Sequence, residues 1–306
     1  MSTRFYTHPD ADRHVTPPGH PEQVLRLKAV RDALADLNLD RHQAPLADPA
    51  ELLRCHPQAY VERIRAAIPA EGWQMLDGDT HAAPGSWDAA LRAVGGAGAA
   101  VDAVLTGQAH SAFVAMRPPG HHAERETAMG FCLFGTVAIA ARRALDHHRL
   151  DRVAVLDFDV HHGNGTQDLL WNDKRAFFAS THQMPLYPGT GAASETGAFG
   201  QIMNVPLAPG TDGAVARAAW GRILDRMIGW KPQLVLISAG FDAHADDPLA
   251  QLEWQDTDFA AITRAIRDAA TVSGAPVVSS LEGGYDLAAL GRSTRAHVIE
   301  LMETAG

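Results

Sequence analysis

Short apolar segments alternate with longer amphipathic segments along most of the chain, and this alternation restricts the possible folds more than any other feature. The apolar segments are almost continuously hydrophobic, as is typical of strands buried on both faces. They lie at 111–116, 152–158, 176–181, 201–207, 233–239 and 275–281. Helices are expected between and beyond them, at 86–106, 134–148, 165–172, 213–229, 256–272 and 286–303. Strands that alternate with helices predict an α/β fold with a parallel sheet covered on both faces.

The first 80 residues are harder to assign. Only the segment 21–37 has the apolar spacing of an amphipathic helix. No repeat, low-complexity tract or long linker divides the sequence, and a chain of 306 residues can bury a substantial core. We therefore expect a single domain over residues 1–306.

Charge and composition argue against several classes of protein. The formal net charge of −10 argues against nucleic-acid binding, and it either favours cationic ligands or serves solubility only. No run of 18 apolar residues is present, so no membrane span is expected. The N-terminus lacks the apolar core of a signal peptide, and Cys55 and Cys132 make no disulfide framework. A cytoplasmic protein is the simplest expectation.

Polar clusters follow five of the predicted strands. They are RPPGHH (117–122), DFDVHHGNG (157–165), STHQ (180–183), GFDAH (240–244) and LEGGYD (281–286). Ligand sites in open parallel sheets form in the crevice beyond the carboxyl ends of the strands. We therefore expect five separate loops to converge on one site.

The second of these clusters indicates a metal site. Asp157, Asp159 and His161 are spaced by two at the end of an apolar strand, which directs them to one face. Burying such groups is costly unless something pairs with them. Asp159 and His161, with Asp242 from another strand end, would leave an open position for water, as in catalytic sites. Asp157 is better placed to orient a histidine.

Three other motifs offer groups for catalysis. His121 and His122 follow two prolines and a glycine that hold their backbone, which suits a general acid–base pair. Phe131, after Gly130, either forms a wall of an apolar slot or simply packs in the core. Tyr285 follows two glycines, and its hydroxyl could reach a developing oxyanion.

Taken together, these motifs resemble the zinc-dependent histone deacetylase family. The similar segments occur in the family's order between about residues 15 and 295: RPPGHH (117–122), GFC (130–132), DFDVHHGNGTQ (157–167), PGTG (188–191), SAGFDAH (238–244) and LEGGYDL (281–287). The class II and bacterial deacetylase-like branch, which includes acetylpolyamine amidohydrolases, is the most similar. The resemblance implies the arginase/deacetylase fold, with a central eight-stranded parallel sheet and helices on both faces.

The resemblance also implies roles for the catalytic residues. His122 would act as the main base and then acid, with His121 as its electrostatic partner. Asp157 would hydrogen-bond His121, and Asn164 would do the same for His122. Tyr285 would donate to the oxyanion. The ligands of the zinc ion would be Asp159, His161 and Asp242.

Further positions match other parts of the family site. Arg26 matches an arginine near an internal exit for acetate. Asp79 matches an aspartate at the rim of the site that binds the substrate backbone. His162 would point to the other face. Gly135 and Thr136 depart from two asparagines in relatives. The substrate tunnel would be lined by Gly130, Phe131, Tyr187, Leu249 and Gly284. A structural K⁺ ion would be bound by Asp157, Asp159, His161, Ser180 and Thr181.

The implied activity is removal of acetyl or related acyl groups from lysine side chains or small acylated amines, with release of acetate. Relatives that prefer acetylated polyamines carry glutamate where this chain has Leu249, so we expect a preference for acyl-lysine. Tyr187 stands where phenylalanine is usual, which affects the polarity of the tunnel. Acetylpolyamine hydrolysis remains an alternative, and the chain could form a homo-oligomer.

Two other functions deserve comparison with this one. A ureohydrolase of the same fold binds two manganese ions through D-x-H-x-D and D-x-D motifs. Here Gly163 replaces the last aspartate of the first motif and His244 that of the second, which leaves too few carboxylates. A non-catalytic binding module would have lost the tyrosine or a metal ligand, and all of these are present.

Overall fold

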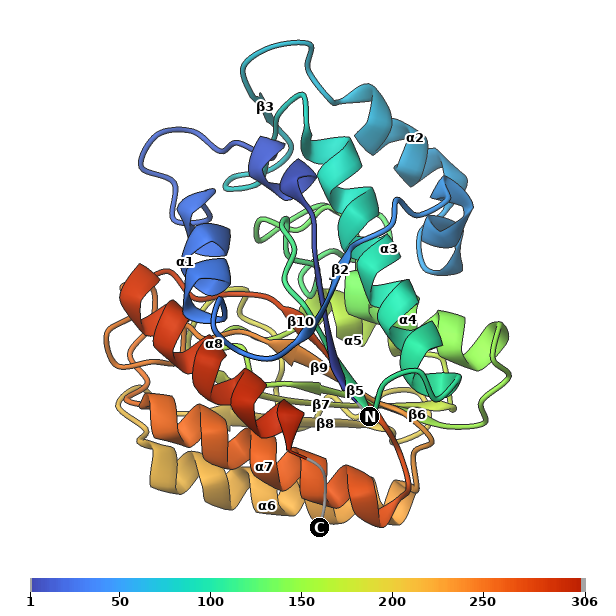
Figure 1. The fold of residues 1–306 in the computed structure, drawn as a ribbon, viewed down its shortest axis with the longest axis vertical. Coiled ribbons are helices and arrows are strands. Elements are labelled where there is room, and N and C mark those ends of the chain that lie inside the picture. Colours follow the sequence, from blue (N-terminus) through green and yellow to red (C-terminus); the bar gives the residue numbers. More distant parts are fainter. Residues whose placement is uncertain (1, 304–306) are drawn as a thin grey trace.

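Eight parallel strands form a central sheet with helices on both faces (Figure 1), which confirms the predicted fold class. The computed structural model describes residues 2–303. Neighbouring strands follow the order β2-β1-β5-β10-β9-β6-β7-β8. Their bounds are β1 Thr3–Thr7, β2 Asp40–Gln43, β5 Ser111–Val114, β6 Val153–Asp157, β7 Ala176–Gln183, β8 Ile202–Leu207, β9 Val235–Ala239 and β10 Val277–Leu281.

The helices divide into two groups. On one face α1 packs on α8, α8 on α7 and α7 on α6; on the other, α3 packs on α4 and α4 on α5. Helix α2 and the antiparallel pair β3–β4 lie at the top of Figure 1. The bounds are α1 Leu25–Ala33, α2 Gln58–Ala66, α3 Ser86–Leu105, α4 Thr136–Asp146, α5 Asn164–Leu170, α6 Gly213–Trp230, α7 Asp256–Val272, α8 Leu287–Met302, β3 Gln74–Met75 and β4 His81–Ala82, with 3-10 turns at Pro9–Arg13 and Pro49–Arg54.

All six predicted strands are present, but two strands of the sheet were not predicted. These are β1 and β2, in the N-terminal region where the sequence pattern is weak. Strand β2 reads DRHQ and is an edge strand whose residues are alternately half-buried and exposed. Strand β1 pairs with β5 on its other side. A short strand with as little apolar character as β2 is formed by its pairing partner rather than by local preference.

The helix predicted at 21–37 is shorter than expected. Helix α1 spans only Leu25–Ala33, because the residues before it turn to bring Glu22 into the core. The Glu22 carboxylate accepts hydrogen bonds from Arg117 and from Arg26, the latter at 3.0 Å from Nη1 to Oε1. All three side chains are fully buried. Burial alone would raise the pKa of Glu22. Its charged neighbours outweigh burial, chiefly the Arg117 guanidinium, and hold the pKa of Glu22 well below its usual range. This ion cluster ties the N-terminal segment to the loop after β5.

The five strands followed by polar clusters are consecutive in the sheet. Strands β5, β10, β9, β6 and β7 are direct neighbours, so their carboxyl ends meet at one edge. Asp157, at the end of β6, lies opposite Ser180 on one side and Ser238 on the other. The predicted convergence of the five loops is therefore confirmed.

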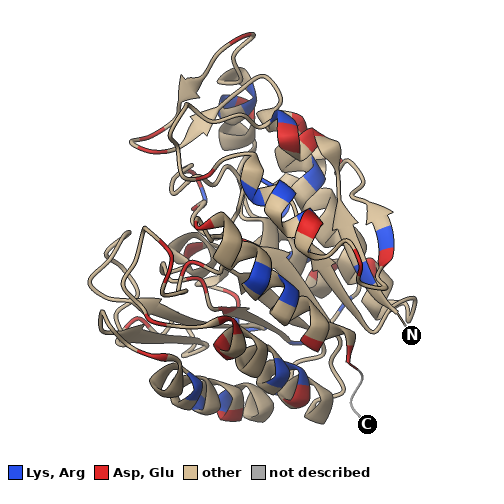
Figure 2. Ribbon diagram, turned by 60° about the vertical axis from the view of Figure 1, so that its left-hand side comes forward, with Lys and Arg blue, Asp and Glu red and all other residues tan. Residues whose placement is uncertain are grey.

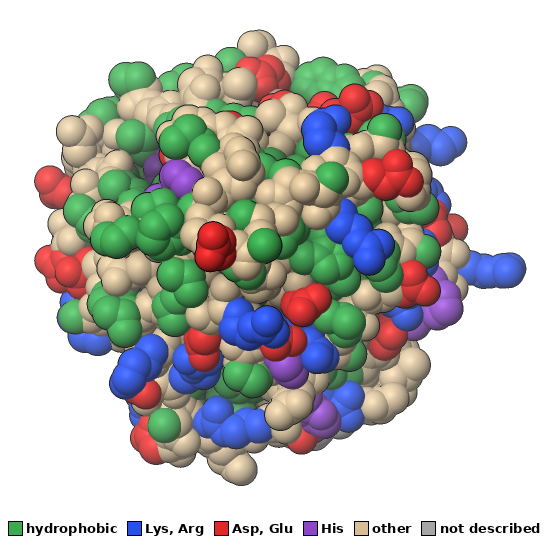
Figure 3. Space-filling view, turned by 90° about the horizontal axis from the view of Figure 1, so that it is seen from above, with side chains coloured by type: hydrophobic (Ala, Val, Ile, Leu, Met, Phe, Trp, Pro, Cys, Tyr) green, Lys and Arg blue, Asp and Glu red, His purple; other side chains and the backbone are tan. Residues whose placement is uncertain are grey.

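Charged side chains are distributed over the surface of the molecule. Figure 2 shows Lys and Arg mostly on helices, with Asp and Glu also on the loops. On the face seen from above in Figure 3, acidic and basic side chains are interspersed among hydrophobic ones. Between residues 2 and 303, no helix combines the length and the hydropathy needed to cross a bilayer.

Candidate active site

A pocket of about 230 Å³ receives residues from the loops after all five of these strands. The loop residues are His122, His161, Tyr187, Leu249 and Tyr285. The remaining lining residues are Asp79, Gly130, Phe131 and Leu186. Apolar walls around a few polar groups are typical of small-molecule sites.

Four of the five residues predicted for the tunnel line this pocket. The exception is Gly284, whose carbonyl instead accepts a hydrogen bond of 2.6 Å from Nε of Arg26. The next residue, Tyr285, faces the pocket in its place. Leu186 was not predicted, because nothing in its local sequence separates it from an ordinary loop leucine.

The predicted ligands Asp159, His161 and Asp242 form a buried cluster, and His161 connects it to the pocket lining. Their ligand atoms all lie within 4.8 Å of one another. Nδ1 of His161 is 3.1 Å from Oδ1 of Asp159 and 3.1 Å from Oδ2 of Asp242. Backbone N–H groups hold the carboxylates in place: Gly283 donates to Asp159 at 2.8 Å, and Val160 to Asp242 at 2.9 Å. The cluster could hold a metal ion.

The spacing by two persists although β6 ends at Asp157. The carboxylate of Asp157 accepts the N–H of Asp159 at 3.1 Å, and that of Asp159 accepts the N–H of His161 at 2.9 Å. These are successive Asx turns, in which a carboxylate bonds the backbone two residues on. Local hydrogen bonds therefore direct the ligands, rather than the strand pleat that was expected to do so.

Two features of the cluster fit a cation. Burial alone would lower the pKa of His161, but the carboxylates of Asp159 and Asp242 outweigh it and raise that pKa to about 10. The carboxylates thus attract positive charge to the position between them. A Cβ atom at Gly283 would lie 2.1 Å from Oδ2 of Asp242, so only glycine lets this loop approach the cluster so closely.

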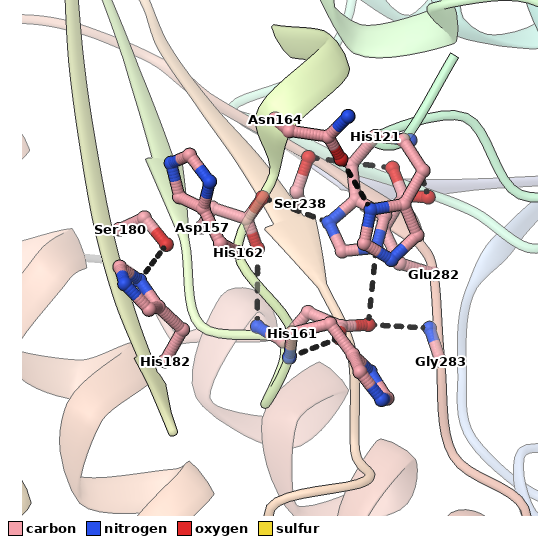
Figure 4. Close-up of polar contacts among 12 residues, drawn as sticks. His121, Asp157, His161, His162, Asn164, Ser180, His182, Ser238, Glu282 and Gly283 are labelled. Carbon is pink, nitrogen blue, oxygen red and sulfur yellow. Dashed lines mark hydrogen bonds and ion pairs between the residues drawn. The ribbon is translucent and has the colours of Figure 1, made fainter. Parts of the chain in front are cut away.

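The histidine pair has the predicted partners (Figure 4). Nδ1 of His121 is 3.0 Å from Oδ2 of Asp157, both labelled in the figure. Nδ1 of His122 is 2.7 Å from Oδ1 of Asn164. The Asn164 amide donates through Nδ2 to Glu124 at 2.8 Å, so its oxygen must accept from His122. The Nε2 atom of His122 is consequently free to accept a proton.

Burial and neighbouring charges separate the pKa values of the two histidines. Burial, with the charges of His121 and His161, lowers the pKa of His122 well below its usual value. Burial would also lower the pKa of His121, but the carboxylates of Asp159 and Asp157 outweigh it and raise that pKa strongly. Protonation therefore favours His121 over His122, which is the neutral histidine of the pair.

Tyr285 lies against Arg26 at the side of the pocket. The guanidinium carbon of Arg26 is 4.9 Å from the centre of the tyrosine ring, and Nη2 donates to the carbonyl of Glu282 at 2.5 Å. Burial foremost raises the pKa of Tyr285 well above its usual value, so the hydroxyl stays protonated and can donate. Arg26 lies behind Tyr285 and does not line the pocket.

Thr80 is a residue of the site that sequence reasoning missed. Its Oγ1 accepts the N–H of Phe131 at 3.0 Å and donates to the carboxylate of Asp79 at 3.1 Å. Phe131 has φ 70°, a left-handed conformation that is unfavourable for a phenylalanine. Thr80 thus helps to hold the pocket wall in a strained conformation and links it to the rim.

The residues matched to a K⁺ site lie at the end of β6, on the loop that follows it and on β7. Ser180 pairs in register with Asp157, and its hydroxyl bonds Nδ1 of His182 at 2.9 Å (Figure 4). The hydroxyl of Thr181 is buried and has no hydrogen-bond partner among the described residues.

His162 faces away from the pocket, as expected. Its ring bonds the hydroxyl of Thr190 at 2.8 Å and the side chain of Gln167 at 3.1 Å.

Gly135 lies close to the side chain of Leu169. A Cβ atom there would be 2.3 Å from Cδ1 of Leu169, so a larger residue would require the end of that leucine to move. The backbone N–H of Gly135 donates to Nε2 of His56 at 3.0 Å.

Comparison with known proteins identifies the family. The family model described as the histone deacetylase domain matches residues 20–301, which is nearly the whole chain. The chain belongs to the histone deacetylase family.

Relatives in this family extend over most of the chain. An uncharacterized protein of Synechocystis is 44% identical over 290 residues, covering 92% of this chain and 93% of that protein. The histone deacetylase-like amidohydrolase of Pseudomonas aeruginosa is 41% identical over 284 residues, covering 89% of this chain and 74% of that protein. The crystal structure of the HDA15 HD domain superposes with a TM-score of 0.93 at 30% identity, covering 99% of this chain and 91% of that one. The arginase/deacetylase fold is therefore shown.

Proposed function

We propose that the chain is a zinc-dependent deacetylase that removes acetyl or related acyl groups from lysine side chains or small acylated amines and releases acetate. One observation carries the proposal: the histidine of a buried Asp–His–Asp cluster lines the same pocket as a neutral histidine and a protonated tyrosine. Membership of the histone deacetylase family supports it.

The donor set suits Zn²⁺, which is commonly held at catalytic sites by three protein ligands with a fourth position for water. Asp159, His161 and Asp242 would bind the ion, which would polarise the amide carbonyl and the attacking water. Two carboxylates and one imidazole are too few donors for the two manganese ions of a ureohydrolase.

The chain's own residues account for the proton transfers. Nε2 of His122 takes the proton of the attacking water and later passes it to the leaving amine. The protonated His121 stabilises negative charge that develops nearby. The Tyr285 hydroxyl donates to the carbonyl oxygen as it becomes an oxyanion. Retention of all these groups argues against a binding module that has lost catalysis.

Two further roles belong to the same proposal. A K⁺ ion held by the backbone of Asp157, Asp159 and His161, with Ser180 and Thr181, would support the site from below, and the unpartnered hydroxyl of Thr181 favours a ligand there. Acetate would leave past Arg26, whose buried cation lies behind Tyr285.

A panel of acylated substrates tests the proposed function. The zinc-loaded protein is expected to hydrolyse acyl-lysine peptides and to be inhibited by hydroxamates, because these chelate zinc and fill an apolar tunnel. The measurement is kcat/KM for acyl-lysine peptides and acetylpolyamines, with and without a hydroxamate. Absence of turnover on the whole panel, together with no inhibition or binding at millimolar hydroxamate, would refute the proposal.

Leu249 makes a prediction about substrate choice. It lines the pocket and offers no negative charge to the distal ammonium of a polyamine, so we expect acyl-lysine to be preferred to N8-acetylspermidine. Leu249→Glu should shift the ratio of the two kcat/KM values toward acetylspermidine by about fivefold, since a close charge pair in a partly desolvated mouth contributes about 1 kcal/mol.

The control for this variant is Leu46→Glu, which adds the same charge at an exposed leucine outside the pocket. If both variants change the ratio equally, the effect is one of overall charge. If the wild type already prefers acetylspermidine and Leu249→Glu changes nothing, other acidic residues of the rim decide substrate choice.

A further inference from the structure

The buried carboxylate of Asp247 joins two loops of the pocket. Asp247 lies between β9 and α7 and is 6% exposed. Its Oδ1 accepts the N–H of Leu249 at 3.0 Å, and its Oδ2 accepts the N–H of Tyr285 at 2.6 Å. Leu249 and Tyr285 both line the pocket, on different loops. The Asp247 side chain thus contacts two parts of the pocket. One is the lip, which is the part of its lining formed by Leu249, and the other is the segment that carries Tyr285, the proposed oxyanion donor.

The environment of Asp247 is unusual for a structural aspartate. Among residues 2–303 it forms no ion pair within 4.0 Å, and burial with the nearby charge of Asp242 raises its pKa to about 7. A buried carboxyl group without a cation is costly unless hydrogen bonds satisfy it. Its acceptor sites are used by three backbone donors, the third being the N–H of Asp286 at 3.3 Å.

The peptide unit between Gly284 and Tyr285 is held at both ends. Its carbonyl accepts from Nε of Arg26 at 2.6 Å, and its N–H donates to Asp247 at 2.6 Å. A peptide unit is planar, so fixing its oxygen and its nitrogen also fixes the plane from which the next side chain projects. The direction of the Tyr285 side chain therefore depends on Asp247 as well as on Arg26.

We propose that Asp247 is a positioning residue that couples the lip at Leu249 to the hydroxyl of Tyr285, so that substrate selection and turnover depend on one carboxylate. The proposal rests on the proposed deacetylase function. Aspartate is required because each of its two oxygens serves a different loop, and asparagine has one acceptor oxygen only.

The test compares Asp247→Asn and Asp247→Ala with the matched control Asp246→Asn. Asp246 is the adjacent aspartate, and its side chain is 59% exposed. Its carboxylate lies 3.1 Å from Arg292 and 3.6 Å from Nδ1 of His244, whereas the backbone N–H groups of Leu249 and Tyr285 donate to Asp247. Zinc content and thermal unfolding establish that each variant is loaded and folded. Hydrogen–deuterium exchange is then measured on peptides that contain Leu249 and Tyr285.

Asp247→Asn is expected to speed exchange at Leu249 or Tyr285, and Asp247→Ala at both, whereas Asp246→Asn changes neither. In kinetics, Asp247→Ala should lower kcat by about tenfold or more, since small displacements of catalytic groups are costly. Adding Leu249→Ala should change the preference for acyl-lysine over acetylspermidine in the wild type and hardly at all in the Asp247→Ala background.

Independent effects of Asp247→Ala and Leu249→Ala on that preference would overturn the coupling. Faster exchange in Asp247→Ala with unchanged kcat and KM would also overturn it, because Asp247 would then only stabilise the two loops without influencing the site. If Asp247→Ala does not fold, the same comparisons are made with Asp247→Asn. Failure of the proposed function is distinguishable, since the wild type would then show no turnover while the exchange experiment still reports on the Asp247 contacts.

Discussion

Asp242→Ala is expected to abolish zinc binding and with it hydrolysis, while the chain stays folded. Asp242 supplies one of only two carboxylates in the cluster, and its Oδ2 lies 3.1 Å from His161. Without it, a single carboxylate and one imidazole remain, which is too few for a tight zinc site. Elemental analysis of the purified variant and its kcat/KM on an acyl-lysine peptide measure the two losses.

The fold should survive because the substitution removes charge from a crowded cluster. Asp242→Ala leaves the N–H of Val160 without its acceptor, which should lower the free energy of unfolding by about 1–3 kcal/mol. Asp242→Asn is the companion variant, since an amide oxygen can still accept from Val160. Asp246→Asn, four residues along the same loop, serves as the control with normal zinc content. Stoichiometric zinc in Asp242→Ala would show that the ligand assignment is wrong.

Tyr285→Phe is expected to fold, bind zinc and lose most of its turnover. Removing one donor to an oxyanion typically lowers kcat by about 10²–10³. The ring keeps its packing, because the guanidinium of Arg26 lies 4.9 Å from its centre and Phe131 meets it edge to face at 5.9 Å. The loss should therefore appear in kcat with little change in KM for the substrate.

The control for a lost tyrosine hydroxyl is Tyr6→Phe. Tyr6 lies on β1, away from the pocket, and its hydroxyl bonds the carbonyl of Ala99 at 3.3 Å. Measured zinc content and melting temperature should match the wild type in both variants. Near wild-type kcat in Tyr285→Phe would mean that the tyrosine only packs against its neighbours.

Much of the candidate site was predictable because many of its functional residues lie close together in short sequence segments. Asp157, Asp159 and His161 lie within five residues, and Asx turns between them depend on local sequence alone. The partners His121–Asp157 and His122–Asn164 followed from family resemblance, and the structure places both at hydrogen-bond distance. Convergence of the loops followed from the parallel sheet, since all carboxyl ends meet at one edge.

Other parts of the site depend on contacts that no short segment contains. Thr80 reaches Phe131 across 51 positions, and Asp247 reaches Tyr285 across 38. Gly284 was predicted to line the tunnel, but its carbonyl is turned away by Arg26, which lies 258 positions earlier.

The sequence by itself determined the order of strands and helices from residue 85 onward and the residues able to bind a metal, because periodicity and local turns encode both. Only the tertiary structure decided that β1 and β2 join the sheet and which loop residues face the pocket. Those outcomes depend on hydrogen bonds and packing between distant segments, whose energies arise only once the chain has brought them together.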